Sequence, residues 1–303
     1  MKKNILILKG GFSNEAEVSR LTAESVAEAL TLKGYKTKLI ELDKNFLSWL
    51  LENKNQVDVI FNALHGAWGE DGKIQSLLEY IKIPYTHSGI VASALGMNKH
   101  LSKSIFFSNG IKVPKGKIIS KKNLLNKDPF ARPFIIKPID EGSSLGTFLI
   151  KEKKIVRNLI KNSKLKKFLA EEYIPGNDIT VAIMNGKAIG MIEIITNEDI
   201  YDYNAKYKSN KTKYIIPKTI NKKTERLLLE VAEMSFKLLQ CKGIARADFR
   251  YDKASQNNEA YLLEINTQPG LTKTSLFPKI AKDAGFDFPD LVEWIVKDAG
   301  VQR

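Results

Sequence analysis

The first third of the chain alternates short apolar segments with amphipathic ones. Residues 5–8, 37–42 and 57–64 are apolar segments typical of buried strands, and residues 74–80 have a helical pattern. Another helical pattern follows the first strand and places on one face Val18, Leu21, Val26, Ala29 and Leu30. Alternating strands and helices predict a small parallel sheet covered by helices, in an amino-terminal α/β domain of residues 1–97.

The pattern changes after residue 98. A helix is predicted at residues 101–109, followed by short strands at residues 116–119, 134–138 and 147–150. This order is typical of a small α+β unit, so we expect a central domain of residues 98–179.

The last part of the chain, residues 180–303, is predicted to form a third domain. It opens with a strand at residues 180–183 and continues into a polar stretch at about 197–213, which we expect to be a long loop. Such a loop is either a lid or a solvated connector, and the sequence leaves both open. The helix predicted at residues 224–240 has the apolar stripe Leu227, Leu228, Val231, Leu238 and Leu239.

Polar residues interrupt two further predicted strands near the carboxy terminus. Period-2 geometry turns Arg246 and Asp248 to one face of the first strand, and Glu264 and Asn266 share a face of the second. Carboxylate and amide oxygens are hard ligands that suit Mg²⁺ together with substrate phosphates. The strand pair therefore predicts a metal site that handles phosphate.

The chain carries a net charge of +14, from 48 basic and 34 acidic residues. Only seven of the basic residues are arginines, the residue favoured for forked recognition of phosphates and bases, and 41 are lysines spread along the chain. The densest run, residues 161–167, is interpreted as a solvated helix face. We therefore expect no nucleic-acid partner and keep nucleic-acid binding as a minority hypothesis.

The apolar segments and the single cysteine indicate the cellular compartment of the protein. No segment approaches the roughly 20 apolar residues of a membrane span, and the apolar part of the amino-terminal segment is shorter than that of a signal peptide. Cys241 lies in an apolar run, where a buried position is favoured over a nucleophile. We expect a cytoplasmic protein with no membrane partner.

Phosphate binding requires a device other than the common glycine-rich motifs, because neither the P-loop pattern nor the dinucleotide pattern G-x-G-x-x-G occurs. A strand that ends at Lys137 and continues into the turn Gly142-Ser143-Ser144 could aim N–H groups and hydroxyls at phosphate oxygens. An ordinary hairpin turn is the alternative.

Two glycine-containing turns follow the predicted strands of the first domain. His65-Gly66 lies at the carboxyl end of a strand, where open α/β sheets place ligands, although a tight turn explains it equally. Glu15 follows Gly10-Gly11 and would attract an ammonium group, such as that of an amino acid. The alternative is that Ser13 or Asn14 caps the next helix.

Taken in order, these motifs resemble the D-alanine–D-alanine ligase family of the ATP-grasp superfamily. The resemblance covers nearly the whole chain, and its motifs are Gly10-Gly11 with Glu15-Ala16-Glu17-Val18-Ser19, His65-Gly66 with Gly69-Glu70-Asp71-Gly72, Pro84-Tyr85-Thr86 with Ser88-Gly89, Lys137-Pro138 with Glu141-Gly142-Ser143-Ser144, Tyr201-Asp202-Tyr203 with Ala205-Lys206-Tyr207, and Asn266-Thr267 with Pro269-Gly270.

The resemblance implies a three-domain fold in which ATP lies between the central and carboxy-terminal domains. It also implies ATP-dependent coupling of two D-alanines into D-alanyl-D-alanine for peptidoglycan precursors, through an acyl phosphate, in a homodimer. Two Mg²⁺ ions, for which Mn²⁺ could substitute, would be held by Asp248, Glu264 and Asn266. The residues that it implies for ATP are Lys99, Lys137, Ser144, Glu171, Ile174 and Asp178.

For the reacting groups the resemblance implies that Arg246 and the Gly270 N–H stabilise the tetrahedral oxyanion. Glu15 would bind the ammonium of the first D-alanine, and Ser143 and Tyr207 would join Glu15 in a hydrogen-bonded triad. The substrate-binding residues that it implies are His65, Lys206, Ser275 and Leu276. Tyr207 is the residue associated with dipeptide rather than D-alanyl-D-lactate formation.

The sequence departs from the family pattern at a few positions. Ile139-Asp140 precede Glu141, so the local charge differs, and Glu172 occupies a position near adenine where many relatives carry a lysine. Gln268 and Leu271 replace common residues around Pro269-Gly270, a change that we expect to be tolerated. A ligase for another carboxylate and amine remains the alternative enzymatic hypothesis.

Overall fold

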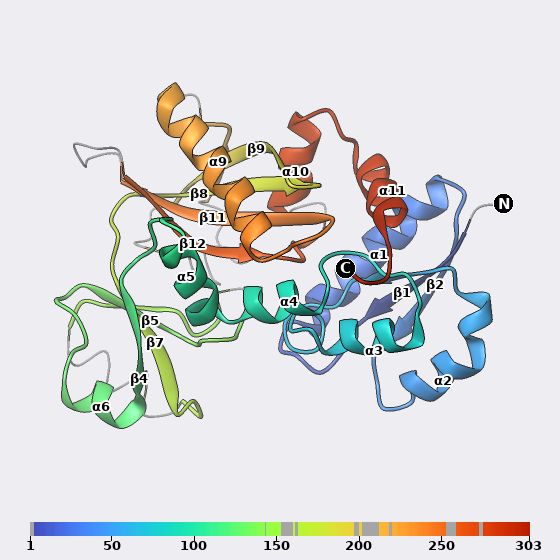
Figure 1. Cartoon of the computed structure of the whole chain (residues 1–303), viewed down its shortest axis with the longest axis horizontal. Helices are drawn as coiled ribbons and strands as arrows, with labels where there is room; N and C mark the ends of the chain where they lie inside the picture. The colour runs from blue at the N-terminus through green and yellow to red at the C-terminus, as the bar shows by residue number, and fades with distance from the viewer. Residues whose placement is uncertain are drawn as a thin grey trace.

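Within the residues that the computed structural model describes, three β-sheets follow one another along the chain (Figure 1). The structure describes residues 3–142, 144–152, 160, 163–196, 200–201, 212–217, 220–252, 259–272 and 275–303. Within this part of the chain, no helix combines the length and the apolar character that crossing a membrane requires.

The first sheet is parallel, with the strand order β2-β1-β3, as the alternating pattern predicted. Strands β1 and β3 are almost completely buried, whereas β2 is partly exposed, and the sheet lies at the blue end of the molecule in Figure 1. The elements of this part are β1 (Asn4–Lys9), α1 (Ala16–Leu32), β2 (Lys36–Glu41), α2 (Phe46–Asn53), η1 (Lys54–Gln56), β3 (Val59–Asn62), α3 (Lys73–Ile81) and α4 (Ile90–Met97).

The second sheet is antiparallel, with the order β4-β7-β5-β6. Its inner face packs a small apolar core that includes Phe134, Ile136 and Phe168. The elements of this part are α5 (Lys99–Ser108), β4 (Gly116–Ser120), α6 (Lys121–Asn126), β5 (Phe134–Lys137), β6 (Phe148–Ile150) and β7 (Lys167–Glu172).

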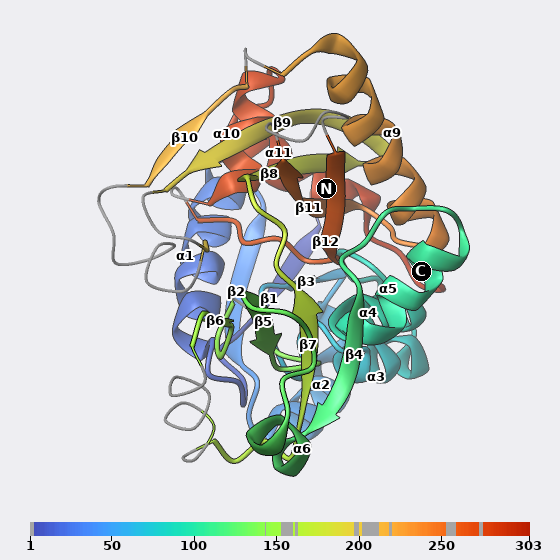
Figure 2. The same ribbon diagram turned by 90° about the vertical axis from the view of Figure 1, so that its left-hand side faces the viewer.

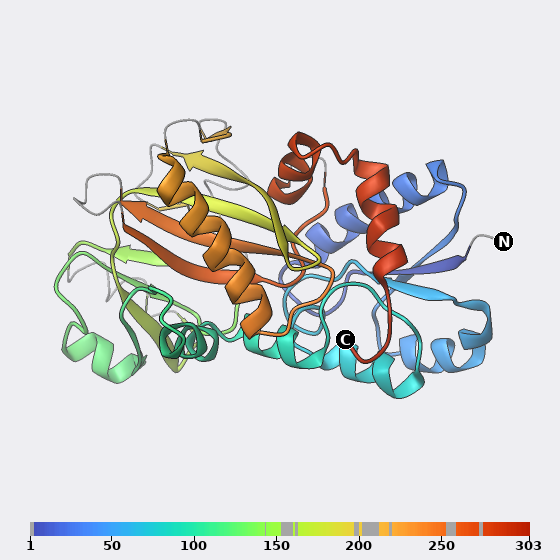
Figure 3. The ribbon, with the colours of Figure 1, turned by 45° about the horizontal axis from the view of Figure 1, so that its top comes forward.

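The third sheet is also antiparallel, with the order β10-β9-β8-β11-β12. Helix α9 lies across one face (Figure 3), and the second sheet lies below this sheet in Figures 1 and 2. The elements of this part are β8 (Asn177–Met184), β9 (Lys187–Ile195), β10 (Lys213–Ile215), α9 (Lys222–Leu238), β11 (Ile244–Asp252), β12 (Glu259–Asn266), α10 (Leu276–Asp283) and α11 (Phe288–Asp298).

The last helix returns to the first sheet. One core cluster joins Ile7 and Phe61 of that sheet to Ile192 of β9 and to Leu291 and Ile295 of α11. The amino- and carboxy-terminal parts therefore share a core. The division at residues 97 and 179 stays a prediction, and β8 already begins at Asn177.

Two predicted helix faces are wrong in detail. Leu21 is 50% exposed and lines a cavity, and Leu227 is 47% exposed. The buried face of α1 contains Ser19 and Thr22 instead, and that of α9 contains Thr224 and Ser235. Small polar residues that bond to nearby groups can lie against a core, so apolarity alone misplaced both stripes.

The structure also bears on the predictions for the lysine run, the long loop and Cys241. Lys167 opens strand β7 and residues 163–166 are not helical, so residues 163–167, the described part of the lysine run, do not form the expected helix face. Of the predicted loop the structure describes only residues 200–201 and 212–213, and Lys213 already belongs to β10. Cys241 is buried, as expected, and burial raises the pKa of its thiol to about 12.

Candidate active site

The strand pair β11 and β12 carries the four polar residues that the sequence singled out. Its antiparallel register places Arg246 opposite Asn266 and Asp248 opposite Glu264. Ala247, between the two polar residues of β11, is fully buried on the other face. The predicted alternation and the meeting of the four groups are both confirmed.

The Arg246 guanidinium forms a forked ion pair with the Asp248 carboxylate. Nε donates to Oδ1 at 2.8 Å and Nη2 to Oδ2 at 2.7 Å, while Thr180 Oγ1 donates to the same Oδ1. Burial alone would lower the pKa of Arg246, but the Asp248 charge and hydrogen bonds raise it. Arg246 is therefore a fixed cation beside the two carboxylates.

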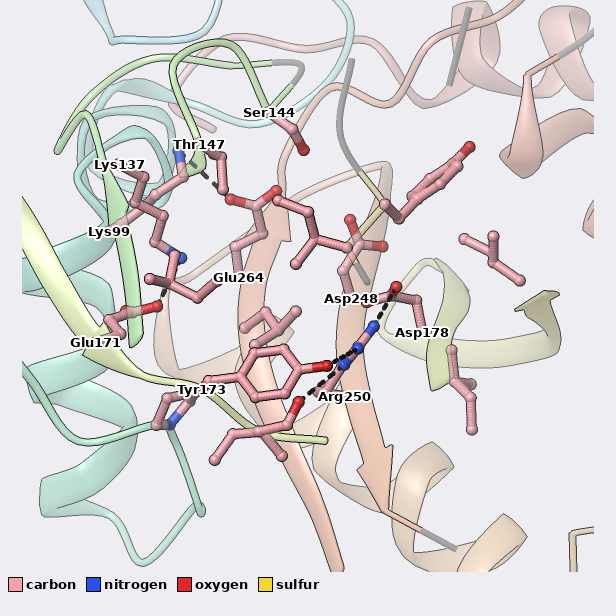
Figure 4. Close-up of a pocket in the computed structure, with 18 of the residues that line it drawn as sticks. Lys99, Lys137, Ser144, Thr147, Glu171, Tyr173, Asp178, Asp248, Arg250 and Glu264 are labelled. Atoms are coloured by element: carbon pink, nitrogen blue, oxygen red, sulfur yellow. Dashed lines mark hydrogen bonds and ion pairs between the residues drawn. The ribbon is translucent and has the colours of Figure 1, made fainter. Parts of the chain in front are cut away.

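Lys99, at the start of α5, links the strand pair to the loop that follows β5. Its Nζ lies 3.4 Å from Glu264 Oε2 and donates to the Glu141 carbonyl, and its backbone N–H donates to the Ile139 carbonyl at 3.0 Å. The close-up in Figure 4 shows Lys99 and Glu264 joined across the cavity. This lysine is thus held by groups from β12 and from the loop after Lys137.

A buried cluster of two lysines and one carboxylate lies behind Lys99. Glu171 accepts from Lys137 Nζ at 2.7 Å and from Lys103 Nζ, and all three side chains are almost fully buried. Burial would raise the pKa of Glu171, but the two lysine charges lower it. Burial lowers the pKa of Lys103 to about 7, whereas Glu171 and Glu264 outweigh burial and raise that of Lys137.

Arg250 organises the opposite wall of the cavity. Its Nη1 donates to Asp178 Oδ2 at 2.7 Å, its Nε to the Ile174 carbonyl at 3.0 Å and its Nη2 to the Tyr173 hydroxyl at 3.2 Å (Figure 4). These bonds fix the chain where it crosses from β7 to β8. Arg250 therefore orients Asp178, and it lies on the same face of β11 as Arg246 and Asp248.

Glu15 is packed between two glycines from distant parts of the chain. A Cβ at Gly66 would meet Glu15 Oε2 at 2.7 Å, and a Cβ at Gly142 would meet it at 2.6 Å. Glu15 itself is the residue before α1, and neither Ser13 nor Asn14 caps that helix. The carboxylate thus lies where the first sheet meets the turn between β5 and β6.

The His65 side chain is buried beside Glu15 and is held at both ring nitrogens. Thr22 Oγ1 lies 3.0 Å from Nε2 and Glu70 Oε1 lies 3.3 Å from Nδ1, so the tautomer follows from these two partners. The His65 carbonyl accepts from Ser13 Oγ at 2.6 Å. This ring is a fixed wall of the site.

Gly270 and Ser275 lie together after β12. Ser275 Oγ is 2.8 Å from Thr272 Oγ1 and accepts from the Thr272 N–H at 3.1 Å, and a Cβ at Gly270 would approach it to 3.0 Å. Ser275 directly precedes α10, whose amino terminus favours an anion. The close approach at position 270 is easiest for glycine.

Two adjoining cavities collect the described site residues that the sequence predicted. Lys99, Glu264 and Leu276 line both, so the cavities meet at these residues. Six other predicted site residues line only the first cavity: Lys137, Ser144, Glu171, Ile174, Asp178 and Asp248. Six further predicted site residues line only the second cavity, which is about 750 Å³ in volume: Glu15, His65, Arg246, Asn266, Gly270 and Ser275.

Three predicted residues, Ser143, Lys206 and Tyr207, lie outside the described residues. Glu172, a departure from the family pattern, also lines the first cavity, and its Oε1 accepts from the Lys115 N–H at 3.0 Å.

Sequence reasoning missed Lys103 and Arg250. Lys103 is four residues after Lys99 and so lies on the same face of α5, which is a usable signal. Arg250 continues the two-residue alternation of Arg246 and Asp248. Both could have been found by extending the periodicity by one step.

The family comparisons agree with this geometry. Residues 109–297 match the model described as "D-ala D-ala ligase C-terminus", and residues 48–88 match "D-ala D-ala ligase N-terminus". A D-alanine–D-alanine ligase of Pelagibacter ubique is 46% identical over all of both chains, and a D-alanine–D-alanine ligase B of Mesorhizobium japonicum is 40% identical over 99% of each.

Among solved structures, the D-alanine–D-alanine ligase from Bacillus anthracis complexed with ATP superposes with a TM-score of 0.83. It is 27% identical, and the match covers 98% of this chain and 97% of that one. The architecture is therefore the ATP-grasp fold, with an amino-terminal parallel sheet and two antiparallel sheets. Together with the full-length sequence matches, it shows that the chain belongs to the D-alanine–D-alanine ligase family.

Proposed function

We propose that this protein is an ATP-dependent ligase that couples two D-alanines into D-alanyl-D-alanine, ADP and phosphate for peptidoglycan precursor synthesis. The observation that carries the proposal is the meeting of the two cavities at Lys99, Glu264 and Leu276. A phosphate bound at this junction would be within reach of groups in both cavities, as transfer between a nucleotide and a second substrate requires.

The first cavity would hold ATP. Lys99 and Lys137 supply positive charge for the phosphates, and the turn containing Ser144 would close over them. Glu171 and Ile174 would contact adenine, and Asp178, oriented by Arg250, would accept from the ribose hydroxyls.

Asp248, Glu264 and Asn266 fit two Mg²⁺ ions in their donor chemistry, since all three present oxygen. Asn266 Oδ1 accepts from the Gln268 N–H at 2.9 Å, which fixes the amide with a lone pair to spare. The described residues contain no cluster of three His, Cys, Asp or Glu side chains, so phosphate oxygens would complete the coordination. When bound, the ions would neutralise charge that develops on the transferred phosphoryl group.

The second cavity would hold the two D-alanines. Glu15 would bind the ammonium of the first, beside the fixed wall of His65, and Ser275 and Lys206 would hold the carboxylate of the second next to Leu276. The first carboxylate attacks the γ-phosphorus while the bond to ADP breaks. The resulting acyl phosphate is attacked at its carbonyl carbon by the second amine, and phosphate leaves.

Arg246 and the Gly270 N–H would stabilise the tetrahedral oxyanion. Arg246 is a permanent cation because its pKa is raised, and both residues line the second cavity. Ser143 and Tyr207 would complete the triad with Glu15, and Tyr207 favours a dipeptide product. We also propose a homodimer that acts in the cytoplasm.

The purified chain tests this function directly. Phosphate release from ATP with Mg²⁺ should rise steeply with D-alanine and stay near background with L-alanine, and mass spectrometry should detect D-alanyl-D-alanine. Equal rates with both enantiomers would contradict the proposal. A mixed amino-acid assay would then identify a ligase for another carboxylate and amine, and steeply salt-dependent binding to duplex DNA would favour the nucleic-acid alternative.

A further inference from the structure

Two buried side-chain amides join the first sheet to the segment after β12. Asn62, the last residue of β3, is fully buried, and Gln268 is 2% exposed. Asn62 Nδ2 donates to Gln268 Oε1 at 2.8 Å, and Gln268 Nε2 donates to the Leu64 carbonyl. The two residues are 206 positions apart in the chain, so this contact links distant segments.

Backbone groups fix the orientation of both amides. Asn62 Nδ2 also donates to the Gly69 carbonyl at 2.9 Å, and Asn62 Oδ1 accepts from the Leu64 N–H at 3.2 Å. A carbonyl can only accept and an N–H can only donate, so flipping either amide would leave buried groups mismatched. The network has one consistent arrangement.

The pair lies between groups that the proposed function assigns to different substrates. Asn62 bonds to Leu64 and to Gly69 and so holds the turn that begins at His65, while Gln268 lies midway between Asn266 and Gly270. Among the described residues that line the two cavities, neither amide occurs. We propose that Asn62 and Gln268 are positioning residues that set the spacing between the D-alanine-binding turn and the segment carrying the metal ligand and the oxyanion donor.

The chemistry of the pair suits positioning. An apolar contact at this place would fill space equally well but would tolerate sliding, whereas buried hydrogen bonds are directional and costly to leave unmade. The segment from Asn266 to Gln268 is therefore held in one register against β3. The inference rests on the proposed function, because it assigns a consequence for the coupling of two D-alanines.

If this segment is misplaced, we expect the enzyme to release phosphate without forming dipeptide. An acyl phosphate that waits for a misaligned amine is open to water, whose oxygen bonds to the carbonyl carbon as phosphate leaves, regenerating D-alanine. The number of phosphates released per dipeptide formed therefore reports positioning. A substitution that only destabilises the fold does not change this ratio in the folded enzyme.

The test compares Asn62→Leu, Gln268→Met and the double variant with Gln75→Leu. Gln75 is a matched control because it is 1% exposed and its Nε2 donates to the same Gly69 carbonyl at 2.7 Å, but it makes no hydrogen bond to Gln268 among the contacts that the structure describes. For each protein, kcat, the KM values for ATP and D-alanine, the phosphate-to-dipeptide ratio and the unfolding midpoint are measured.

Each single variant is expected to lose roughly 10- to 100-fold in kcat, the effect of about 1 Å of misplacement, with the KM for ATP little changed. The ratio should rise above one phosphate per dipeptide in both, and it should stay at one in Gln75→Leu. The double variant should be no slower than the slower single variant, because both remove the same link.

Two results would overturn the inference in distinguishable ways. If the wild type makes dipeptide and the variants match Gln75→Leu in kcat and in the phosphate-to-dipeptide ratio, only the positioning role of Asn62 and Gln268 is refuted. A wild type that makes no dipeptide would refute the proposed function and the role with it. If a single variant does not fold, the double variant, which leaves neither side-chain amide unpaired, carries the same test.

Discussion

Glu264 is the residue at which the two cavities, Lys99 and the strand pair meet. Its side chain is 27% exposed, so replacing its charge should not disturb the core. We predict that Glu264→Gln lowers kcat roughly 100-fold or more, since metal-ion stabilisation of a phosphoryl transfer contributes several kcal/mol. D-alanine-dependent phosphate release at saturating ATP and Mg²⁺ measures this loss.

The control for this substitution is Glu259→Gln, on the same strand. Glu259 forms an ion pair with Lys112 at 2.6 Å that lines neither cavity among the described residues. Its removal should leave kcat within about twofold, since exposed ion pairs contribute little. Equal rates in the two variants would mean that Glu264 does not bind the metal.

The buried Lys103 is expected to make the free energy of unfolding depend on pH. Burial lowers its pKa from 10.5 to about 7, so between pH 7 and 10.5 the unfolded chain binds the proton that the folded protein has lost. Stability therefore rises with pH across this window on account of Lys103. Glu171 and Lys137, which lie beside it, titrate elsewhere, because the pKa of Glu171 is lowered below 4.5 and that of Lys137 is raised above 10.5.

Urea unfolding at pH 6.5 and 8.5 checks this prediction. The stability advantage of the wild type over Lys103→Met should be larger at pH 8.5, while Lys112→Met, at a half-exposed lysine, should show no such change. An advantage that is the same at both pH values would mean that Lys103 stays protonated throughout.

Residue periodicity explains which site residues the sequence could predict. Arg246, Asp248 and Glu264 follow from the two-residue repeat of a strand, and their meeting follows from an antiparallel pair. Arg250 extends the same strand repeat and Lys103 follows Lys99 by one helical turn, but each is paired with a carboxylate from another element. The spacing therefore places Lys103 and Arg250 on the faces that carry the site, but the sequence does not show which carboxylate pairs with each.

At the scale of elements, the turn between β5 and β6 meets the start of α1 at Glu15. Gly142 has no room for a Cβ, which would lie 2.6 Å from Glu15 Oε2. We predict that Gly142→Ala displaces the carboxylate and raises the KM for D-alanine about tenfold or more, the effect of weakening a hydrogen bond to a charged group. Initial rates over a range of D-alanine concentrations measure it.

Gly300→Ala is the matched control for this prediction. A Cβ there makes only an ordinary contact, with Arg303 Nη1 at 3.6 Å, and the position lies outside both cavities among the described lining residues. Its KM should equal that of the wild type. An unchanged KM in Gly142→Ala would show that Glu15 can move without affecting the substrate.

Strands were predicted better than helix faces. Strands β1 and β3 of the first sheet are buried on both sides, so their apolar runs are unambiguous. The faces of α1 and α9 are not, because Leu21 borders a cavity and Leu227 is exposed while serines and threonines are buried. On both helices a half-exposed leucine follows the same spacing as the core residues, so apolarity alone does not identify the buried face.

At the scale of the whole molecule, the sequence predicted three consecutive parts but not how they join. The contact between Asn62 and Gln268 depends on the placement of one sheet against another, and no local pattern encodes it. The same holds for α11, which follows the third sheet in the chain but packs on the first.

The shared core of the first and third sheets makes α11 a structural bridge. Ile295 is 1% exposed in the cluster that also contains Ile7 of β1 and Ile192 of β9, and Tyr35 donates to Glu293 Oε1 at 3.0 Å beside it. We predict that Ile295→Ala lowers the free energy of unfolding by about 2–5 kcal/mol, the cost of a cavity in a packed core. Chemical denaturation measures the loss.

Hydrogen exchange shows whether α11 stabilises the first and third sheets or only its own end of the chain. If the cluster is one cooperative unit, Ile295→Ala should reduce the protection of amides in β1 and β9 as well as in α11. Lys297→Ala, on the exposed face of the same helix, should leave all three unchanged apart from the loss of its ion pair with Glu293. Lost protection confined to α11 would mean that the amino-terminal sheet is stable without the helix, and that the first and third sheets unfold independently despite their shared core.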